Sequence, residues 1–423
     1  MTFEAIASLV ILFFTAVFMV LDLIPTSIVA LIGAVFCGFL GLVEPSSILS
    51  TLGTDTMILL IGLSIVGSAM FSTGIADRIS RRLLKIFGRS EMGALIAVMI
   101  VGTLLSAVAS NTAVVITMIP LIISMSKKIK VSPGRVLYPM VAACSFGSAL
   151  TLIGTPSNIA GNTVLQSNNL QTMGFFDVAW VGVPLTILGF IYMLTIGKKT
   201  LPANTYSEEN NIDGGVDYED TPPWNKKSIL TAIICAITLA VMIIQPSFLP
   251  LSTIAFCGAL ILIITRCVTE KEAWRSIDFS TMLLFTGLMT ITTAVNNTGG
   301  GKLLAKLILS AIGNTTNPYI LTAILGIICV ILTSFISNTA ATMLLGSVAI
   351  YIAQAIGANP VTMVMVVVIT ANACFATPVG GIAYTLVTEP GKYSFRDFVR
   401  MGLPLAILNL ILAIIIIPLV WSF

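Results

Sequence analysis

The sequence predicts an all-α polytopic membrane protein made of two inverted-topology repeats of five transmembrane helices. Its 423 residues are 57% hydrophobic and only 9% charged, with a mean hydropathy of +1.04. Soluble domains carry about a quarter charged residues. Apolar stretches of spanning length recur along the chain, and the second half repeats the first.

The composition excludes several classes of function. Because the chain has no histidine, it cannot hold a Ser-His-Asp triad or a His-ligated metal. Its seven cysteines stand singly in apolar runs without metal-ligand spacing, which is typical of buried hydrophobes. The net charge of +3 is too diffuse for a nucleic-acid surface. We therefore expect no organic cofactor and no nucleic-acid partner.

Ten apolar stretches predict membrane spans. They cover residues 3–21, 25–43, 56–74, 136–166, 176–197, 228–245, 250–265, 280–298, 361–388 and 402–423. Two further uncharged stretches, 92–126 and 318–356, are too long for one crossing and short for two crossings with a turn. We interpret each as a re-entrant helical hairpin. The polar stretch 198–227, with its prolines, glycines and six acids, predicts a linker between the halves.

The two halves are related by a tandem duplication. An offset of 225 aligns residues 25–88 with 250–313 without a gap, and 16 of the 64 pairs are identical. Two motifs recur further along: Ser-Asn-Thr at 110–112 and 337–339, and Thr-Pro at 155–156 and 377–378. Internal repeats of this kind are common in membrane transporters. The first repeat is then 1–197 and the second 228–423.

Loop charges predict the orientation of the two repeats. With the basic loop at 75–91 in the cytoplasm, 19 of 21 basic residues are cytoplasmic, and only Lys302 and Lys306 are external. The protein is then an integral protein of the cell (inner) membrane, with both termini on the external side. Five spans is an odd number, so the second repeat is inserted upside down. The first hairpin enters from the cytoplasm and the second from outside.

The Ser-Asn-Thr triplets lie at the centres of the hairpins, where a tip near mid-membrane must interrupt its hydrogen-bond ladder. Irregular backbone at that depth is tolerated only when it is buried in protein or lines a cavity. One isolated polar group would be interpreted as an interhelical hydrogen bond that holds two membrane helices together. Two identical triplets at matched positions favour a binding site.

Two Thr-Pro pairs, Thr155-Pro156 and Thr377-Pro378, fall inside long apolar stretches. Proline breaks or kinks a helix, and Thr before Pro is the order expected of an N-cap and first helical residue. We therefore predict a discontinuous helix in each repeat. With the hairpins, this gives four helix N-termini that could meet near the bilayer centre.

Four helix N-termini favour an anion, because each carries about half a positive charge and free N–H donors. The centres of the hairpins and of the broken helices contain no Lys, Arg, Asp or Glu. Co-bound cations would therefore balance the charge, and neutral oxygens would hold them, with Ser106 and Thr333 one helical turn before the triplets. Sodium fits such a site. A proton-driven carrier would more naturally use a titratable group.

These residues resemble the divalent anion:sodium symporter family, which carries dicarboxylates, citrate or sulfate. The resemblance rests on the paired triplets, on GTPSN at 154–158, and on ATPVGG followed by PGKYSFRDFVRMGLPL within 376–405. It implies an elevator-type homodimer in which a substrate-carrying domain slides against a scaffold, here spans 3–74 and 228–298. It also implies interfacial arms at 77–88 and 302–312.

The resemblance also implies the site residues. The first sodium would be held by Ser106, Ser110, Asn111 and Gly154, and the second by Thr333, Ser337, Asn338 and Ala376. The triplets and breaks would contact the substrate through Ser110, Asn111, Thr112, Thr155, Pro156, Asn158, Ser337, Asn338, Thr339, Thr377 and Pro378. One departure is Gly380-Gly381, where many relatives carry a proline-asparagine turn.

The sequence thus predicts sodium-coupled uptake of a small dianion, with a C4-dicarboxylate favoured. The alternatives within transport are a sulfate or other oxyanion carrier, a dicarboxylate exchanger, and a sodium/proton antiporter. An anion channel is a second class, although inverted repeats with central breaks favour alternating access. An intramembrane enzyme would need facing acids or a base for its serine, and the sequence offers neither at that depth.

Overall fold

The computed structural model describes residues 2–203, 223–246, 248–311 and 315–423, and every regular element in these ranges is a helix. The predicted all-α class is confirmed. The first half contains α1 (Phe3–Leu21), α2 (Thr26–Phe39), α3 (Pro45–Ser50), α4 (Asp55–Ser72), α5 (Ile75–Phe87), α6 (Glu91–Ser106), α7 (Asn111–Ile129), α8 (Leu137–Ser148), α9 (Pro156–Ser167), α10 (Ala179–Tyr192) and α11 (Lys198–Thr200). The second half contains α12 (Lys226–Ile244), α13 (Leu251–Ile264), α14 (Glu270–Ser276), α15 (Phe279–Asn297), α16 (Gly300–Ala311), α17 (Pro318–Thr333), α18 (Asn338–Ile356), α19 (Pro360–Ala371), α20 (Ile382–Gly391) and α21 (Phe395–Val420).

Helices of the first repeat pack against helices of the second repeat in two matched pairs. Helix α2 packs against α15, and α4 packs against α13. A Cβ added at Gly62 of α4 would lie 2.6 Å from the carbonyl carbon of Ala255 in α13, and one at Gly287 of α15 would lie 2.5 Å from the carbonyl oxygen of Ala30 in α2. The two glycines are equivalent at the 225-residue offset, and so are the two alanines. The same glycine–alanine contact therefore occurs once in each helix pair. We call α1–α4 and α12–α15 the scaffold helices.

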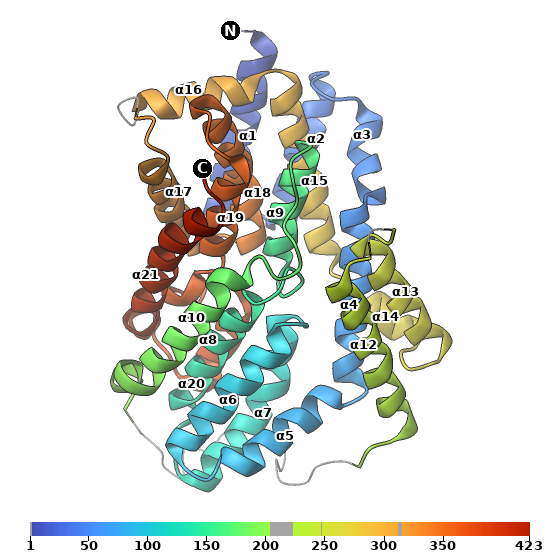
Figure 1. Ribbon diagram of the computed structural model, residues 1–423, viewed down its shortest axis with the longest axis vertical. Helices are drawn as coiled ribbons and strands as arrows, with labels where there is room; N and C mark the ends of the chain where they lie inside the picture. The colour runs from blue at the N-terminus through green and yellow to red at the C-terminus, as the bar shows by residue number, and fades with distance from the viewer. Residues whose placement is uncertain (1, 204–222, 247, 312–314) are drawn as a thin grey trace.

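Each hairpin consists of two helices that pack against each other, α6 with α7 and α17 with α18. Their tips are the short segments 107–110 and 334–337. In Figure 1 the two hairpins lie toward opposite ends of the molecule, and the arms α5 and α16 run along these opposite ends. This arrangement is what two oppositely inserted repeats require. We call α6–α10 and α17–α21 the hairpin bundle.

Both predicted broken helices are interrupted. Segment 149–155 separates α8 from α9, and segment 372–381 separates α19 from α20. The halves interlock across the repeats, because α9 packs against α18 and α20 against α7. The second half of each broken helix therefore contacts the hairpin of the other repeat, which brings the four N-termini of these helices into one bundle.

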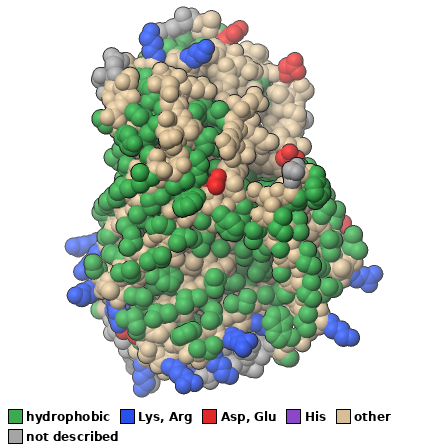
Figure 2. Space-filling model, viewed as in Figure 1, with side chains coloured by type: hydrophobic (Ala, Val, Ile, Leu, Met, Phe, Trp, Pro, Cys, Tyr) green, Lys and Arg blue, Asp and Glu red, His purple; other side chains and the backbone are tan. Residues whose placement is uncertain are grey.

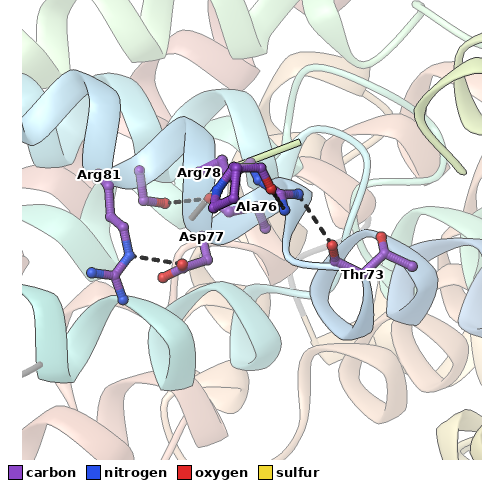
Figure 3. Close-up of polar contacts among 7 residues, drawn as sticks. Thr73, Ala76, Asp77, Arg78 and Arg81 are labelled. Atoms are coloured by element: carbon purple, nitrogen blue, oxygen red, sulfur yellow. Dashed lines mark hydrogen bonds and ion pairs between the residues drawn. The ribbon is translucent and has the colours of Figure 1, made fainter. Parts of the chain in front are cut away.

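The first arm, α5, is fixed at its start (Figure 3). The Arg78 guanidinium donates to the carbonyl of Thr73 at 3.3 Å and to that of Pro223 at 2.7 Å. It also lies 5.0 Å from the ring centre of Trp224. Both arms follow a left-handed glycine at equivalent positions, Gly74 and Gly299. The equivalent of Arg78 in the second arm is a leucine, at position 303, so this link exists in one arm alone.

Several boundaries differ from the prediction. Helix α21 begins at Phe395 rather than 402, because Ser394 and Asp397 form a capping box there. Helix α3 follows α2 after a short turn that the sequence did not indicate. Both ends of the predicted linker are helical, since Lys198 lies in α11 and Lys226 opens α12. Residues 204–222 of that linker, and residue 312 of the second predicted arm, lie outside the described residues.

The surface fits a membrane. Within the described residues, eight helical stretches are long and apolar enough to cross one, and five shorter apolar helices accompany them. Figure 2 shows hydrophobic side chains over the middle of the visible face, with most of the visible Lys and Arg toward the end where α5 lies. A band of apolar surface bordered by basic residues is expected where a helical protein meets lipid.

Candidate functional site

The first hairpin tip presents two buried oxygens. Among the described residues, Asn111 Oδ1 has no hydrogen-bond partner. Ser106 Oγ faces the thiol of Cys144, a weak partner, and makes no regular hydrogen bond in the described part of the chain. Buried polar atoms are rarely left unpaired, and a bound ion is one partner that can satisfy them. Both residues belong to the first predicted sodium set.

The remaining residues of the first tip lie at the start of α7. Ser110 is the N-cap residue and is exposed, while Asn111 and Thr112 open the helix and are half-buried. The Thr151 hydroxyl donates to the carbonyl of Ala107, which fastens the tip to the break between α8 and α9. Gly154 is buried in that break, and a Cβ there would lie 2.5 Å from the carbonyl oxygen of Ser148. The site therefore needs glycine at that position.

At the second hairpin tip, three oxygens surround the side-chain amide nitrogen of Asn338, namely those of the Thr333 hydroxyl and of the Ala371 and Gly380 carbonyls. The Thr333 hydroxyl lies 2.8 Å from the side-chain amide of Asn338 and 2.6 Å from the carbonyl of Ala371. The same amide faces the carbonyl of Gly380 at 3.1 Å. A ring of acceptors of this kind is satisfied either by an amide N–H₂ or by a cation. Of the second predicted sodium set, Thr333 and Asn338 are thus adjacent.

Other residues of the second tip have different partners. Ser337 is exposed, and its hydroxyl accepts from the backbone N–H of Ala340 at 3.3 Å as the cap of α18. Thr339 is buried at the start of α18. Ala376 ends the short turn Cys374–Ala376 and is buried. The carbonyls that join Thr333 and Asn338 are those of Ala371 and Gly380, which the sequence did not single out.

The two breaks are built differently. Thr155 is the N-cap residue of α9 and Pro156 its first residue, as predicted. The corresponding expectation for Thr377-Pro378 is wrong, because Gly381 is the N-cap of α20, and the helix begins at Ile382. Thr377 instead donates to the carbonyl of Ser334 at 2.6 Å and accepts from the N–H of Gly380 at 3.2 Å.

Asn158 is held entirely inside the protein. Its amide nitrogen donates to the carbonyls of Ser148 and Thr151, each at 2.9 Å, and its Oδ1 accepts from Asn372 at 2.8 Å. Ser157 completes the cluster by donating to Asn372 Oδ1 at 2.6 Å. Asn158 is fully buried and both its donors are used, so it supports the break. Asn372 was missed, although an amide in the apolar run 361–376 was a signal for it.

The arrangement can bind ions of both signs without formal charges. Segments 106–112, 148–158, 333–339 and 371–382 contain no Asp, Glu, Lys or Arg. The described residues contain no cluster of three or more His, Cys, Asp or Glu. Helix N-termini favour an anion, and hydroxyl, amide and carbonyl oxygens are the ligands of hard cations. The residues present therefore fit an anion together with alkali cations.

A cleft of about 380 Å³ lies between the scaffold and the hairpin bundle. Asp55 and Ser252 from the scaffold and Asn162 and Gln166 from α9 contribute to its lining, and none of the predicted site residues does. The scaffold touches α9 beside it through a hydrogen bond between the Thr56 and Thr163 hydroxyls, 3.0 Å apart. The cleft also reaches the first break, because Leu152 of segment 149–155 contributes to its lining.

Comparison with known families decides the class of protein. The family model described as citrate transporter matches residues 10–368 and 321–423, which together span nearly the whole chain. The chain belongs to the citrate transporter family.

Two relatives of this member of the citrate transporter family match most of its length. The uncharacterized transporter YfbS of Escherichia coli is 21% identical, over 93% of this chain and 95% of that protein. The sodium-dependent dicarboxylate transporter SdcS of Staphylococcus aureus is 24% identical, over 99% and 86%. The predicted resemblance to sodium-coupled carriers of divalent anions is confirmed. The chain is an integral membrane transporter and not an enzyme, as predicted.

A solved structure shares the fold. The crystal structure of the Alcanivorax borkumensis YdaH transporter matches with a TM-score of 0.64 over 88% of this chain and 87% of that one. The sequence identity is 17%, so this likeness concerns the fold alone. It supports the predicted fold class for this member of the citrate transporter family.

Proposed function

We propose that this chain is a secondary active transporter that takes up a C4-dicarboxylate together with sodium. The observation that carries the proposal is the uncharged cluster at the two tips and two breaks, where Ser106 and Asn111 keep buried oxygens without regular partners. Four helix N-termini favour a dianion, and the oxygens favour alkali cations. The name of the SdcS relatives, sodium-dependent dicarboxylate transporters, supports this substrate class.

Each tip would hold one sodium ion. The first would use Ser106, Asn111 and Ser110, with the backbone of Gly154. The second would use Thr333 and Asn338, and the carbonyls of Ala371 and Gly380 support a place for it between these side chains. Ser337 and Ala376 would contribute backbone oxygens.

The substrate carboxylates would meet side-chain and backbone groups of the two tips and two breaks. These are Ser110, Asn111, Thr112, Thr155 and Pro156 from the first repeat and Ser337, Asn338, Thr339, Thr377 and Pro378 from the second. Asn158 would act through the shape of the first break, because its donors are already used. A dianion bound here gains little from formal charge, so sodium binding must precede or accompany it.

Sodium also supplies the driving force. Each positive charge carried inward gains about 2.3 kcal/mol per 100 mV. A dianion accompanied by more than two sodium ions therefore enters with net positive charge and is drawn in by the membrane potential. Transport would proceed by an elevator movement of the hairpin bundle against the scaffold, in a homodimer of the cell membrane with both termini external.

The proposal is tested by uptake of labelled succinate into proteoliposomes that contain the purified protein, with empty liposomes as control. We expect accumulation above the external concentration when sodium is outside and potassium inside. Uptake that is unchanged when potassium replaces external sodium would contradict sodium coupling. Uptake that never exceeds equilibration would indicate a channel. Parallel assays with labelled citrate and sulfate test the substrate class, and preference for either would contradict the C4-dicarboxylate assignment.

A further inference from the structure

Two asparagines join the two repeats at the level of the helix breaks. Asn158 follows the break of the first repeat, and Asn372 opens the break of the second. Their side chains meet at 2.8 Å, with Asn372 donating to Asn158 Oδ1, and both are buried. We call this contact the inter-repeat bridge. It is a direct side-chain bond between the two inverted halves beside the proposed site.

The hydrogen-bond pattern fixes the orientation of both amides. Both donors of Asn158 go to the carbonyls of Ser148 and Thr151, so its oxygen must face Asn372. Ser157 donates to Asn372 Oδ1, so the nitrogen of Asn372 must face Asn158. No other orientation satisfies all the donors and acceptors in this buried cluster. The bridge therefore holds one geometry.

The bridge is connected to both hairpin tips. On one side, the Thr151 carbonyl accepts from Asn158, and the Thr151 hydroxyl donates to the carbonyl of Ala107 in the first tip. On the other side, Asn372 follows Ala371, whose carbonyl accepts from Thr333 at 2.6 Å. Thr333 in turn contacts Asn338 of the second tip. A continuous path of hydrogen bonds and one peptide unit thus runs from tip to tip.

The bridge breaks the internal symmetry of the chain. At the 222-residue offset, the equivalent of Asn158 is Gly380 and the equivalent of Asn372 is Leu150. The hydrogen bond therefore joins two amides at non-equivalent positions, one from each repeat. A link of this kind makes each tip sensitive to the other, since a shift at Ala107 or Ala371 moves a shared partner.

We propose that Asn372 and Asn158 are positioning residues that couple the two tips, so that sodium bound at one tip strengthens sodium binding at the other. This inference rests on the proposed function and adds residues that would touch neither the substrate nor the ions. Coupling energies between sites are typically 1–3 kcal/mol, or about 5- to 150-fold in affinity. Removal of the bridge should therefore reduce the cooperativity of sodium binding while the protein still folds.

The test measures sodium-dependent thermal stabilisation of the purified protein and sodium activation of succinate uptake, each as a full titration against choline. The variant is Asn372→Leu. The matched control is Asn409→Leu, because Asn409 is another fully buried asparagine, whose amide donates to the carbonyl of Ile369 at 2.9 Å within the same repeat. The stabilisation measurement does not depend on the identity of the substrate.

We expect wild type and Asn409→Leu to respond to sodium with a Hill coefficient above one. Asn372→Leu should respond with a coefficient near one and a half-saturating concentration about tenfold higher. Equal coefficients in wild type and Asn372→Leu would overturn the inference while leaving sodium coupling intact. A wild type that is neither stabilised nor activated by sodium would overturn sodium coupling itself.

If Asn372→Leu does not fold, the Hill coefficient of Ser157→Ala is compared with that of wild type instead. It removes the 2.6 Å bond to Asn372 Oδ1 and leaves the volume nearly unchanged. A lowered Hill coefficient in this variant supports the bridge, and an unchanged coefficient overturns it. A merely structural role would lower the unfolding temperature of either variant without altering the sodium response.

Discussion

Uncharged oxygens determine which ions the site can hold. A lysine or arginine at the tips would bind a dianion without sodium, whereas hydroxyls, amides and carbonyls provide only partial charges. In the proposed transporter, the anion would then depend on co-bound cations for most of its electrostatic stabilisation. Its coupling to sodium would follow from the absence of formal charge in segments 106–112 and 333–339.

The two triplet asparagines should both be needed for sodium. We predict that Asn111→Ala and Asn338→Ala each raise the half-saturating sodium concentration for uptake about tenfold, which corresponds to about 1.4 kcal/mol. Asn359→Ala is the control, because Asn359 caps α19 through a 3.0 Å bond to Val361 away from the cluster. Normal sodium dependence in both triplet variants would remove the assigned sites.

At the level of elements, the sequence predicted much of the arrangement because its signals are local. Apolar length, the paired triplets and Thr-Pro motifs are each visible within a short window. The start of α20 was misplaced because Gly380-Gly381 lengthen the second break, and because Thr377 donates to the carbonyl of Ser334 in the second hairpin tip. Asn372 was missed for the same reason, since its partner lies in the other repeat.

The glycines at the scaffold crossings should be intolerant of a methyl group. In Gly62→Ala, the added Cβ would lie 2.6 Å from the backbone of Ala255, so the helices must separate. Overpacking of this kind costs about 1–3 kcal/mol, and Gly287→Ala should behave alike. Gly67→Ala in the same helix is the control, since its nearest atom is 4.0 Å away. The unfolding temperature in detergent should fall in the first two variants only.

The start of the first arm should depend on Arg78. We predict that Arg78→Gln lowers the unfolding temperature, because the carbonyl of Pro223 loses its 2.7 Å donor and Trp224 its cation. A hydrogen bond that involves a charged group contributes about 1.5–3 kcal/mol. Arg82→Gln, an exposed position on the same helix, should have no effect. Equal unfolding temperatures for the two variants would contradict this role of Arg78.

At the scale of the whole molecule, an elevator requires the hairpin bundle to slide past the scaffold. Within the described residues, side-chain hydrogen bonds across this boundary join Thr56 to Thr163, Asn296 to both Asn168 and Tyr351, and Thr292 to Ser347. Such hydrogen bonds can be exchanged for others as the surfaces move, whereas the paired scaffold helices are locked by close glycine contacts. Movement is therefore expected between these two units and not within the scaffold.

A cross-link across that boundary should stop transport. In a background without the native cysteines, Thr56→Cys with Thr163→Cys places two thiols where hydroxyls lie 3.0 Å apart. Oxidation should abolish uptake and reduction should restore it. Ser27→Cys with Ser280→Cys is the control, because these hydroxyls lie 3.1 Å apart between two scaffold helices. Full uptake by the oxidised first pair would contradict the elevator proposal.

The central claim is that both triplets contribute to one site for a dianion and sodium. An experimental structure of the protein in sodium and succinate tests it most directly. We predict ordered succinate in contact with Asn111 and Asn338 together, with an ion beside each asparagine. Succinate bound instead in the cleft beside Asp55 and Gln166, or at one triplet while the other faces lipid, would contradict the account.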